Sequence, residues 1–204
     1  MEKLQVLLAT MNQKDFSIVE EMNLRCGAVI ANQAGREQIE TRGSVKMITT
    51  ATRGVGLNRN IALMAADGEI LLMADDDVRY NDDMETAVLT AFRENPKADV
   101  IIFGMDMVRE GVVTQRRQTT KKRLHFWNSM RFGTYRIAVR RKAIVDNNIT
   151  FHQSFGGGCP FSAGEDSLFL KACFDRGLEV YAHDYVLGQC CKDSSSWFVG
   201  YNQK

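Results

Sequence analysis

The sequence predicts an α/β protein in which helices cover a mainly parallel central sheet. The first hundred residues alternate short apolar runs with helical patterns, and this rhythm is typical of parallel βαβ units. The run "EILLMA" at residues 69–74 is an almost continuous apolar stretch, as expected of a buried strand. Leu57, Ile61 and Ala65 recur at four-residue spacing, which places them on one face of a helix.

The elements of the first half follow from these patterns in order. Strands are expected at residues 4–10, 27–32, 44–49, 69–74 and 98–105, and helices at 15–24, 57–66 and 82–94. Asn81 is expected to cap the last of these helices, which starts with acidic residues and stops before Pro96.

The second half is less regular. We expect a hairpin turning at Glu110-Gly111, a strand leading into a short helix within residues 134–145, a helix at 166–176 and a last strand within 178–190. The glycine-rich loop at residues 154–164 is either a mobile loop or a plain surface connector. No repeat or linker is evident, so residues 1–204 are expected to form one domain. Residues 1–105, with their regular βα pattern, would form a nucleotide-binding half. Residues 106–204 would form a second half that contributes the side for an acceptor substrate.

The bulk composition narrows the class of protein. The chain has 204 residues, of which 45% are hydrophobic and 25% charged, as in ordinary globular proteins. The formal net charge of +1 implies no general attraction to nucleic acid. No run approaches the ~20 apolar residues of a transmembrane helix, and the N-terminus does not resemble a signal peptide. The five cysteines include no C-x-x-C pair, which favours reduced thiols in a cytoplasmic protein over a zinc site.

Three consecutive carboxylates, Asp75, Asp76 and Asp77, directly follow the central strand. Ligands of open α/β sheets bind beyond the carboxyl ends of the strands. Asp75 and Asp77 flank one residue, a spacing that can direct two carboxylates toward one Mg²⁺ or Mn²⁺ ion. A solvated turn before a helix would have the same composition, because the helix dipole favours acidic residues there. On spacing alone, both interpretations remain open.

Two other features could belong to the same site. Glu165 and Asp166 begin a helix, whose N-terminus stabilises the ionised carboxylate that a general base requires. Acidic residues favour first turns in any case, so this pair alone is a weak signal. Arg53 and Arg59 lie close in sequence to the acidic cluster and could bind phosphate, although Arg59 could instead lie on a solvated helix face.

Taken in order, these motifs resemble the family 2 glycosyltransferases of GT-A fold. The segment "ATMN" ends the first strand, and "RGVGLNRNIALMAADGEILLMADDDV" joins an Arg-Asn helix to a Gly-Glu dipeptide and an acidic cluster. The segment "GEDSLFL" follows about ninety residues later. The resemblance covers roughly residues 4–185. It implies a Rossmann-like GT-A fold and transfer of a sugar from a nucleotide donor with inversion at the anomeric carbon.

The resemblance also implies roles for the carboxylates. Asp77 would be the main ligand of a Mn²⁺ or Mg²⁺ ion, with Asp75 as a second ligand. Asp76 would face the ribose or sugar of the donor. Asp166 would be the catalytic base, and Glu165 is the second candidate for that role.

Polar residues near the ends of the first two strands and in the Arg-Asn helix would help bind the nucleotide, by the same resemblance. Thr10, Asn12 and Arg59 would line its pocket. Where the family commonly has an acidic cluster that reads the base, this chain has the amides Asn32 and Gln33. An amide can hydrogen-bond a pyrimidine edge, and a UDP-sugar is the expected donor.

The expected acceptor is a hydroxyl of a glycan or a lipid-linked molecule, in cell-surface polysaccharide synthesis. The basic residues between Arg116 and Arg123 could contact the inner membrane face, or they could be a solvated surface. Phe126 and Trp127 could stack on a sugar ring, but core packing is the more common role of such aromatics. The chain is short for this family, so a C-terminal segment that closes the site could be missing.

Other classes of protein fit the sequence less well. A nucleotidyltransferase would carry a glycine-rich basic loop after the first strand, and "ATMNQKDFS" has no glycine. A phosphoacceptor signalling domain would carry its acidic pair where this chain has Thr10 and Asn12. A nucleotide-binding module of the same fold without catalysis remains compatible with the sequence.

Overall fold

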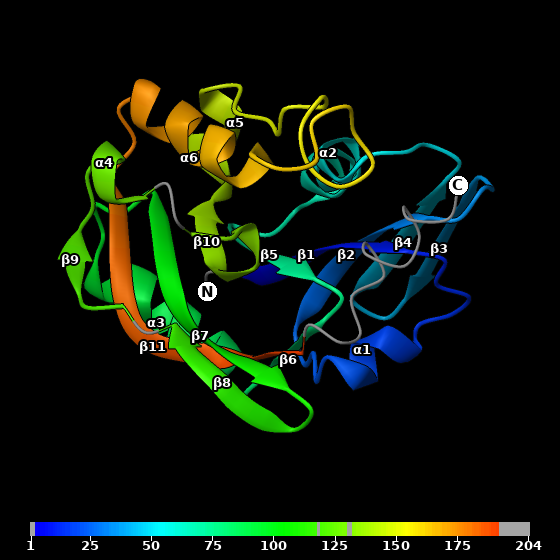
Figure 1. Ribbon diagram of the computed structural model, residues 1–204, viewed down its shortest axis with the longest axis horizontal. Helices are drawn as coiled ribbons and strands as arrows, with labels where there is room; N and C mark the ends of the chain where they lie inside the picture. The colour runs from blue at the N-terminus through cyan, green and yellow to red at the C-terminus, as the bar shows by residue number, and fades with distance from the viewer. Residues whose placement is uncertain (1–2, 118, 130–131, 192–204) are drawn as a thin grey trace.

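The computed structural model describes residues 3–117, 119–129 and 132–191, which form one mixed sheet flanked by helices (Figure 1). The strands are β1 (Leu4–Met11), β2 (Gly27–Gln33), β3 (Gln38–Arg42), β4 (Val45–Thr50), β5 (Ile70–Asp75), β6 (Val78–Tyr80), β7 (Val100–Arg109), β8 (Val112–Arg117), β9 (Lys122–Arg123), β10 (Ile137–Arg140) and β11 (Val180–Cys191). The helices are α1 (Ser17–Glu21), α2 (Val55–Ala65), α3 (Met84–Glu94), α4 (Phe126–Ser129), α5 (Arg141–Asp146) and α6 (Glu165–Asp175), with a 3₁₀ turn η1 (Thr134–Arg136).

The sheet is mainly parallel, as the sequence predicts. Its strands follow the order β3-β4-β2-β1-β5-β10-β7-β11-β6, with β8 and β9 paired to β7 and β11. Strands β4, β2, β1 and β5 pair in parallel, and so do β7 and β11. Strand β10 lies between β5 and β7 and runs antiparallel to both. The start of β10 therefore lies at the same edge of the sheet as the carboxyl end of β5.

The two faces of the sheet carry separate parts of the core, because side chains alternate along each strand. Val6 and Leu8 point to the face that α1 and α3 cover. Leu7 points to the opposite face, where α2, α5 and α6 pack along the top of Figure 1. None of the helices in the described ranges has the length and apolar character needed to span a bilayer.

Several local predictions are confirmed. Chain reversal between β7 and β8 occurs at Glu110 and Gly111, whose φ angles of 50° and 76° allow a tight hairpin turn. Strand β10 leads directly into the short helix α5, and α6 begins within one residue of its expected start.

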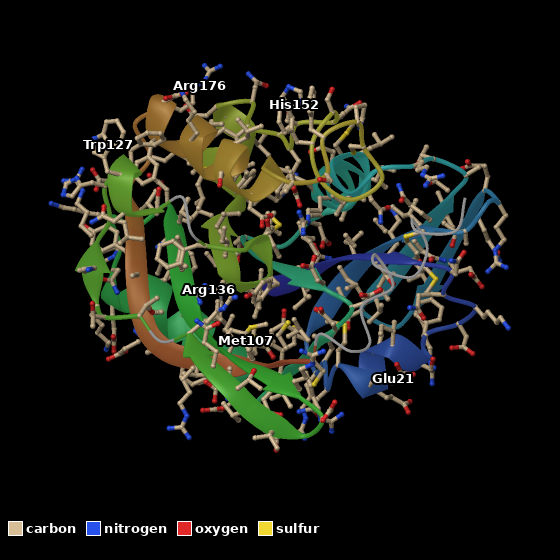
Figure 2. The ribbon with its side chains drawn as sticks, viewed as in Figure 1. Glu21, Met107, Trp127, Arg136, His152 and Arg176 are labelled. Atoms are coloured by element: carbon tan, nitrogen blue, oxygen red, sulfur yellow. The ribbon has the colours of Figure 1, made fainter. Side chains whose placement is uncertain are left out.

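Other local predictions are wrong. Helix α1 is shorter than expected, and strands β3 and β6 were not anticipated, because β3 is a polar edge strand and β6 has three residues. Asn81 does not cap α3 with its side chain: Nδ2 donates to the carbonyl of Val186 in β11, and the helix begins after Asp83. Trp127 is 89% exposed at the outer side of α4, so it does not pack in the core (Figure 2).

Candidate active site

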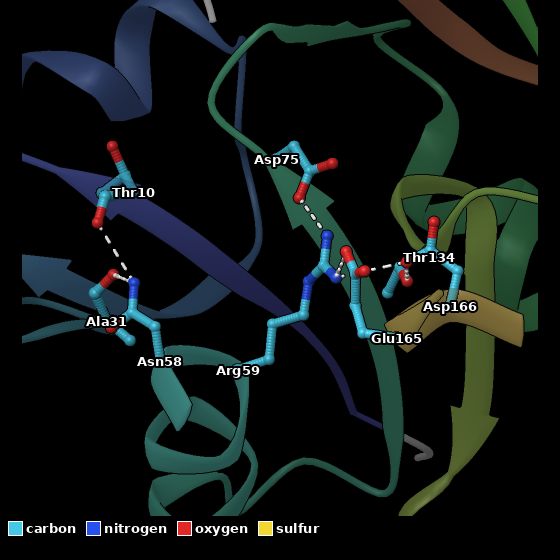
Figure 3. Close-up of polar contacts among 8 residues, drawn as sticks. All are labelled: Thr10, Ala31, Asn58, Arg59, Asp75, Thr134, Glu165 and Asp166. Atoms are coloured by element: carbon cyan, nitrogen blue, oxygen red, sulfur yellow. Dashed lines mark hydrogen bonds and ion pairs between the residues drawn. The ribbon is translucent and has the colours of Figure 1, made fainter. Parts of the chain in front are cut away.

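The polar side chains that the sequence singles out gather at the carboxyl edge of the parallel strands. Thr10 lies near the end of β1, Asn32 near the end of β2, and Asp75 ends β5. Helix α2 begins beside the same edge, and Asn58 in its first turns donates to the carbonyls of Thr10 and Ala31 at 3.1 and 2.8 Å (Figure 3). This buried amide fixes the helix to the ends of two neighbouring strands, so the next residue, Arg59, is held over the site.

Arg59 joins the two acidic motifs. Its Nη2 lies 2.8 Å from Oδ1 of Asp75, at the end of β5. Its Nη1 lies 3.1 Å from Oε1 of Glu165 and 3.2 Å from Oδ1 of Asp166, both at the start of α6 (Figure 3). One guanidinium therefore bridges carboxylates that are ninety or more residues apart in sequence. The sequence placed Arg59 in the nucleotide pocket, and the structure places it between carboxylates.

Arg59 is the buried cation of the site. Its side chain is 6% exposed and its guanidinium lies 5.4 Å from the centre of the Phe151 ring. Although burial opposes its charge, the carboxylates of Asp75, Asp166 and Glu165 raise the pKa of Arg59 above its ordinary value. A cation in this position holds carboxylates together that would otherwise repel one another.

The two candidate bases differ in their surroundings. The Glu165 side chain is 12% exposed and that of Asp166 is 32% exposed. Gly156 closes over Glu165: a Cβ atom at this glycine would lie 2.6 Å from Cδ of Glu165. Burial raises the pKa of Asp166 to about 6, while Arg59 opposes this rise and Glu165 adds to it. Asp166 is thus the more accessible of the two carboxylates, and its raised pKa brings its titration close to neutral pH.

Thr134, in η1, was not identified from the sequence. Its hydroxyl donates to Oδ1 of Asp166, and the side chain is buried (Figure 3). No motif marks this residue. It reaches the site because β10 runs antiparallel beside β5, which the sequence pattern alone does not reveal.

Asp77 is the most unusual of the three adjacent carboxylates. Burial raises its pKa to about 7, the neighbouring charges of Asp75 and Asp76 add to the rise, and a hydrogen bond from the Cys190 thiol opposes it. Its Oδ1 is buried without a hydrogen-bond partner among the described residues. A buried carboxylate oxygen beside two like charges is a position that a cation would stabilise.

Asp76 and Thr10 form a direct pair. Thr10 Oγ1 donates to Oδ2 of Asp76 at 2.7 Å and accepts from Nε2 of Gln13 at 3.0 Å. Asn32 is fully buried: its amide accepts from the backbone N–H of Gln13 and donates to the Gln13 carbonyl, both at 3.0 Å. Asn32 therefore lies beneath the site and holds Gln13, which the sequence analysis did not single out.

Asn12 lies on the surface of the turn that follows β1. Its φ of 57° is left-handed, a conformation that asparagine tolerates better than most residues. Its backbone N–H donates to the carbonyl of Gln33 at 3.0 Å. The side chain is exposed, so it is available to a ligand at this edge of the sheet.

The glycine-rich loop before α6 is packed onto the start of α2. The N–H of Val55 donates to the carbonyl of Gly157 at 3.0 Å, and the N–H of Gly156 donates to the carbonyl of Phe161 at 2.7 Å. The rings of Phe155 and Phe161 stack, with their centroids 4.8 Å apart. The loop is thus held by hydrogen bonds within itself and by one to the start of α2. Neither a plain surface connector nor a freely mobile loop needs such contacts.

The acidic turn fits a divalent cation only in part. No group of three or more His, Cys, Asp or Glu side chains in the described ranges forms a complete metal site. Mg²⁺ and Mn²⁺ are commonly bound through one or two carboxylates, with substrate phosphates completing the set. Oδ1 of Asp77, which lacks a hydrogen-bond partner in the described part of the chain, suits such a site. A cavity of about 240 Å³ lies beside the acidic turn and is lined by Gln13, Ile18, Glu21, Met22, Asp76, Asp77, Val78, Arg79 and Cys191.

Comparison with known proteins identifies the family. Residues 31–154 match the sequence model of glycosyl transferase family 2. The chain therefore belongs to glycosyl transferase family 2. A search among curated protein sequences found no match.

Solved structures confirm the GT-A fold. S. aureus TarS 1-349 in complex with UDP-GlcNAc superposes with a TM-score of 0.71 at 18% identity, covering 97% of this chain and 60% of that chain. The complex of S. aureus TarS 1-349 with UDP gives a TM-score of 0.67 at 20% identity, covering 93% of this chain and 60% of that chain. At 18% and 20% sequence identity, the structural similarity establishes that the chains share a fold. This chain spans 60% of the length of the TarS 1-349 chain.

Proposed function

We propose that this protein is an inverting glycosyltransferase that moves a sugar from a nucleoside diphosphate, expected to be UDP, to an acceptor hydroxyl. The observation that carries the proposal is the bridge that Arg59 makes between Asp75 and the Glu165-Asp166 pair. It brings the acidic turn and the candidate base to one place at the ligand-binding edge of the sheet. Complexes of S. aureus TarS with UDP-GlcNAc and UDP support a nucleotide-sugar donor.

Asp166 is the proposed general base. Its exposure favours it over Glu165, whose side chain is less exposed and whose carboxylate is covered by Gly156. In the proposed reaction the acceptor hydroxyl gives its proton to Asp166 and its oxygen bonds to the anomeric carbon. The bond from that carbon to the diphosphate breaks, and its electron pair leaves with the nucleotide. A single displacement of this kind inverts the anomeric configuration.

Asp77 is the proposed main ligand of a Mn²⁺ or Mg²⁺ ion, with Asp75 contributing the oxygen that Arg59 does not bind. The buried Oδ1 of Asp77, which has no hydrogen-bond partner among the described residues, supports this assignment. When bound, such an ion would neutralise the charge of the leaving diphosphate. Asp76, oriented by Thr10, and the exposed Asn12 are proposed to contact the donor, while Asn32 acts through Gln13.

The acceptor is proposed to be a glycan or lipid-linked hydroxyl used in surface polysaccharide synthesis, on the cytoplasmic side of a membrane. The exposed basic side chains Arg116, Lys121, Lys122 and Arg123 support a peripheral contact with an anionic membrane face. These finer points rest on the family resemblance.

Thermal unfolding with UDP, GDP, CMP and TDP, each with and without Mn²⁺, tests donor binding. We expect metal-dependent stabilisation by one nucleoside diphosphate, because a ligand that binds only the folded state raises its stability. The absence of a shift with all four would refute a nucleotide-dependent transferase.

Asp166→Asn tests the base. We expect donor binding to persist while transfer falls about 10²–10⁴-fold, the usual cost of losing a general base. Glu165→Gln is the matched control and is expected to lose less activity. If Asp166→Asn moves the sugar at a near-normal rate, Glu165 would be the base instead. If the wild type binds the donor but moves no sugar, the protein would be a non-catalytic nucleotide-binding module.

A further inference from the structure

The antiparallel strand β10 brings a hydroxyl to the candidate base. Ala138 pairs with Leu72 and Arg140 with Ile70, so the chain before β10 runs toward the carboxyl end of β5. Thr134 lies in this segment and is 1% exposed. A buried hydroxyl at the ligand-binding edge of the sheet has to be hydrogen-bonded, and its partner here is a carboxylate.

Thr134 and Arg59 bind the same oxygen of Asp166. The Thr134 hydroxyl donates to Oδ1, and Nη1 of Arg59 lies 3.2 Å from that atom. The two donors come from different elements, η1 and α2. No side chain or backbone N–H in the described ranges donates a hydrogen bond to Oδ2, and the Asp166 side chain is 32% exposed.

This asymmetry has a chemical consequence. Rotation of the carboxylate would break the contacts of Oδ1 with both donors at once, so the plane of the group is fixed. Catalytic groups work best when neighbouring contacts hold them near the productive geometry. Oδ1 is thus occupied by hydrogen bonds from Thr134 and Arg59, and Oδ2 is the oxygen that can accept a proton from a substrate.

We propose that Thr134 is a positioning residue which, together with Arg59, holds Asp166 with Oδ2 directed at the acceptor hydroxyl. The proton of the acceptor moves to Oδ2 as the acceptor oxygen bonds to the anomeric carbon and the nucleoside diphosphate leaves. The inference rests on the proposed function, in which Asp166 is the base. It adds a residue that no motif of the family resemblance includes.

The central test compares Thr134→Val with Thr134→Ser. Valine keeps the volume of the buried side chain and removes the hydroxyl, whereas serine keeps the hydroxyl. We expect kcat of Thr134→Val to fall about 10- to 100-fold, the usual effect of losing a hydrogen bond to a charged group. The KM for the donor is expected to stay within about twofold, and Thr134→Ser to retain most of kcat.

A pH profile separates positioning from simple support of the fold. The hydrogen bond from Thr134 lowers the pKa of Asp166, so its loss is expected to move the acidic limb of kcat/KM to higher pH. Thr114→Val is the control, because Thr114 donates its hydroxyl to the carbonyl of Met107, away from Asp166. It is expected to leave both kcat and the pH profile unchanged.

The outcomes distinguish this inference from the function on which it rests. An active wild type with kcat of Thr134→Val within twofold, or with Thr134→Ser as impaired as Thr134→Val, overturns the positioning role alone. A wild type that transfers no sugar overturns the proposed function and this role with it. If Thr134→Val does not fold, as judged by thermal unfolding, Thr134→Ala replaces it and the same outcomes apply.

Discussion

Replacing Asp77 by asparagine is expected to stabilise the ligand-free protein at neutral and alkaline pH. The pKa of Asp77 is raised by burial and by the charges of Asp75 and Asp76, from an ordinary value of 3.8 to about 7. An asparagine has nearly the same shape and no charge, so it removes the cost of ionising a carboxylate in this position.

The sign and the size follow from proton linkage. Below pH 3.8 Asp77 is protonated in both states, and ionisation then does not affect stability. Between pH 3.8 and about 7 the unfolded chain ionises while the folded chain does not, so the wild type loses stability as the pH rises. At about 1.4 kcal/mol per unit of pKa, the full loss is up to about 4 kcal/mol at pH 8. In a chain of this length that corresponds to a gain of about 8–16 °C in Tm for Asp77→Asn.

The assay is thermal and urea unfolding of wild type and Asp77→Asn at pH 5 and pH 8, each with and without UDP and Mn²⁺. The advantage of the variant is expected to shrink by more than half at pH 5, because less of the linkage cost has then accumulated. Added UDP and Mn²⁺ are expected to stabilise the wild type and to lose this effect in the variant, if Asp77 is the main metal ligand.

A control separates this effect from loss of any negative charge. Asp175 is 58% exposed and pairs with Lys171 four residues earlier, so Asp175→Asn is expected to change stability by less than about 0.5 kcal/mol at both pH values. An Asp77→Asn protein that is no more stable than wild type at pH 8, or equally favoured at pH 5, would refute the reasoning.

Two further substitutions test the bridge and the loop above it. Arg59→Met leaves buried carboxylates without their cation and is expected to lower the free energy of unfolding in urea at pH 8 by about 3–5 kcal/mol. Arg25→Met breaks an exposed ion pair and is expected to lower it by less than about 1 kcal/mol. Equal losses in the two variants would contradict the role of Arg59 as a bridge. Gly156→Ala adds a Cβ atom 2.4 Å from Val55 and beside Glu165, whereas Gly35→Ala adds one in open space at a similarly left-handed φ. Gly156→Ala is therefore expected to cost more than Gly35→Ala in stability and to reduce transfer, and equal stability losses would show that backbone strain alone matters.

The strands and helices were predictable where the chain carries a strong local pattern. The apolar run of β5, the four-residue spacing in α2 and the acidic start of α6 each follow from side-chain periodicity or from helix-terminus chemistry, which depend on neighbours in sequence. The polar edge strand β3 and the three-residue strand β6 carry no such pattern. Their hydrogen bonds with β4 and β11 define them.

The sequence by itself determined the family and the GT-A fold, and it indicated the carboxylates proposed for the site, because these depend on the order and composition of motifs. Tertiary structure alone decided which of these residues contact one another and which are buried. It placed Arg59 between three carboxylates, buried Asn32 beneath Gln13 and brought Thr134 to Asp166. The physical reason is that charge pairing and burial depend on distance in space, and β10 approaches β5 from the opposite direction.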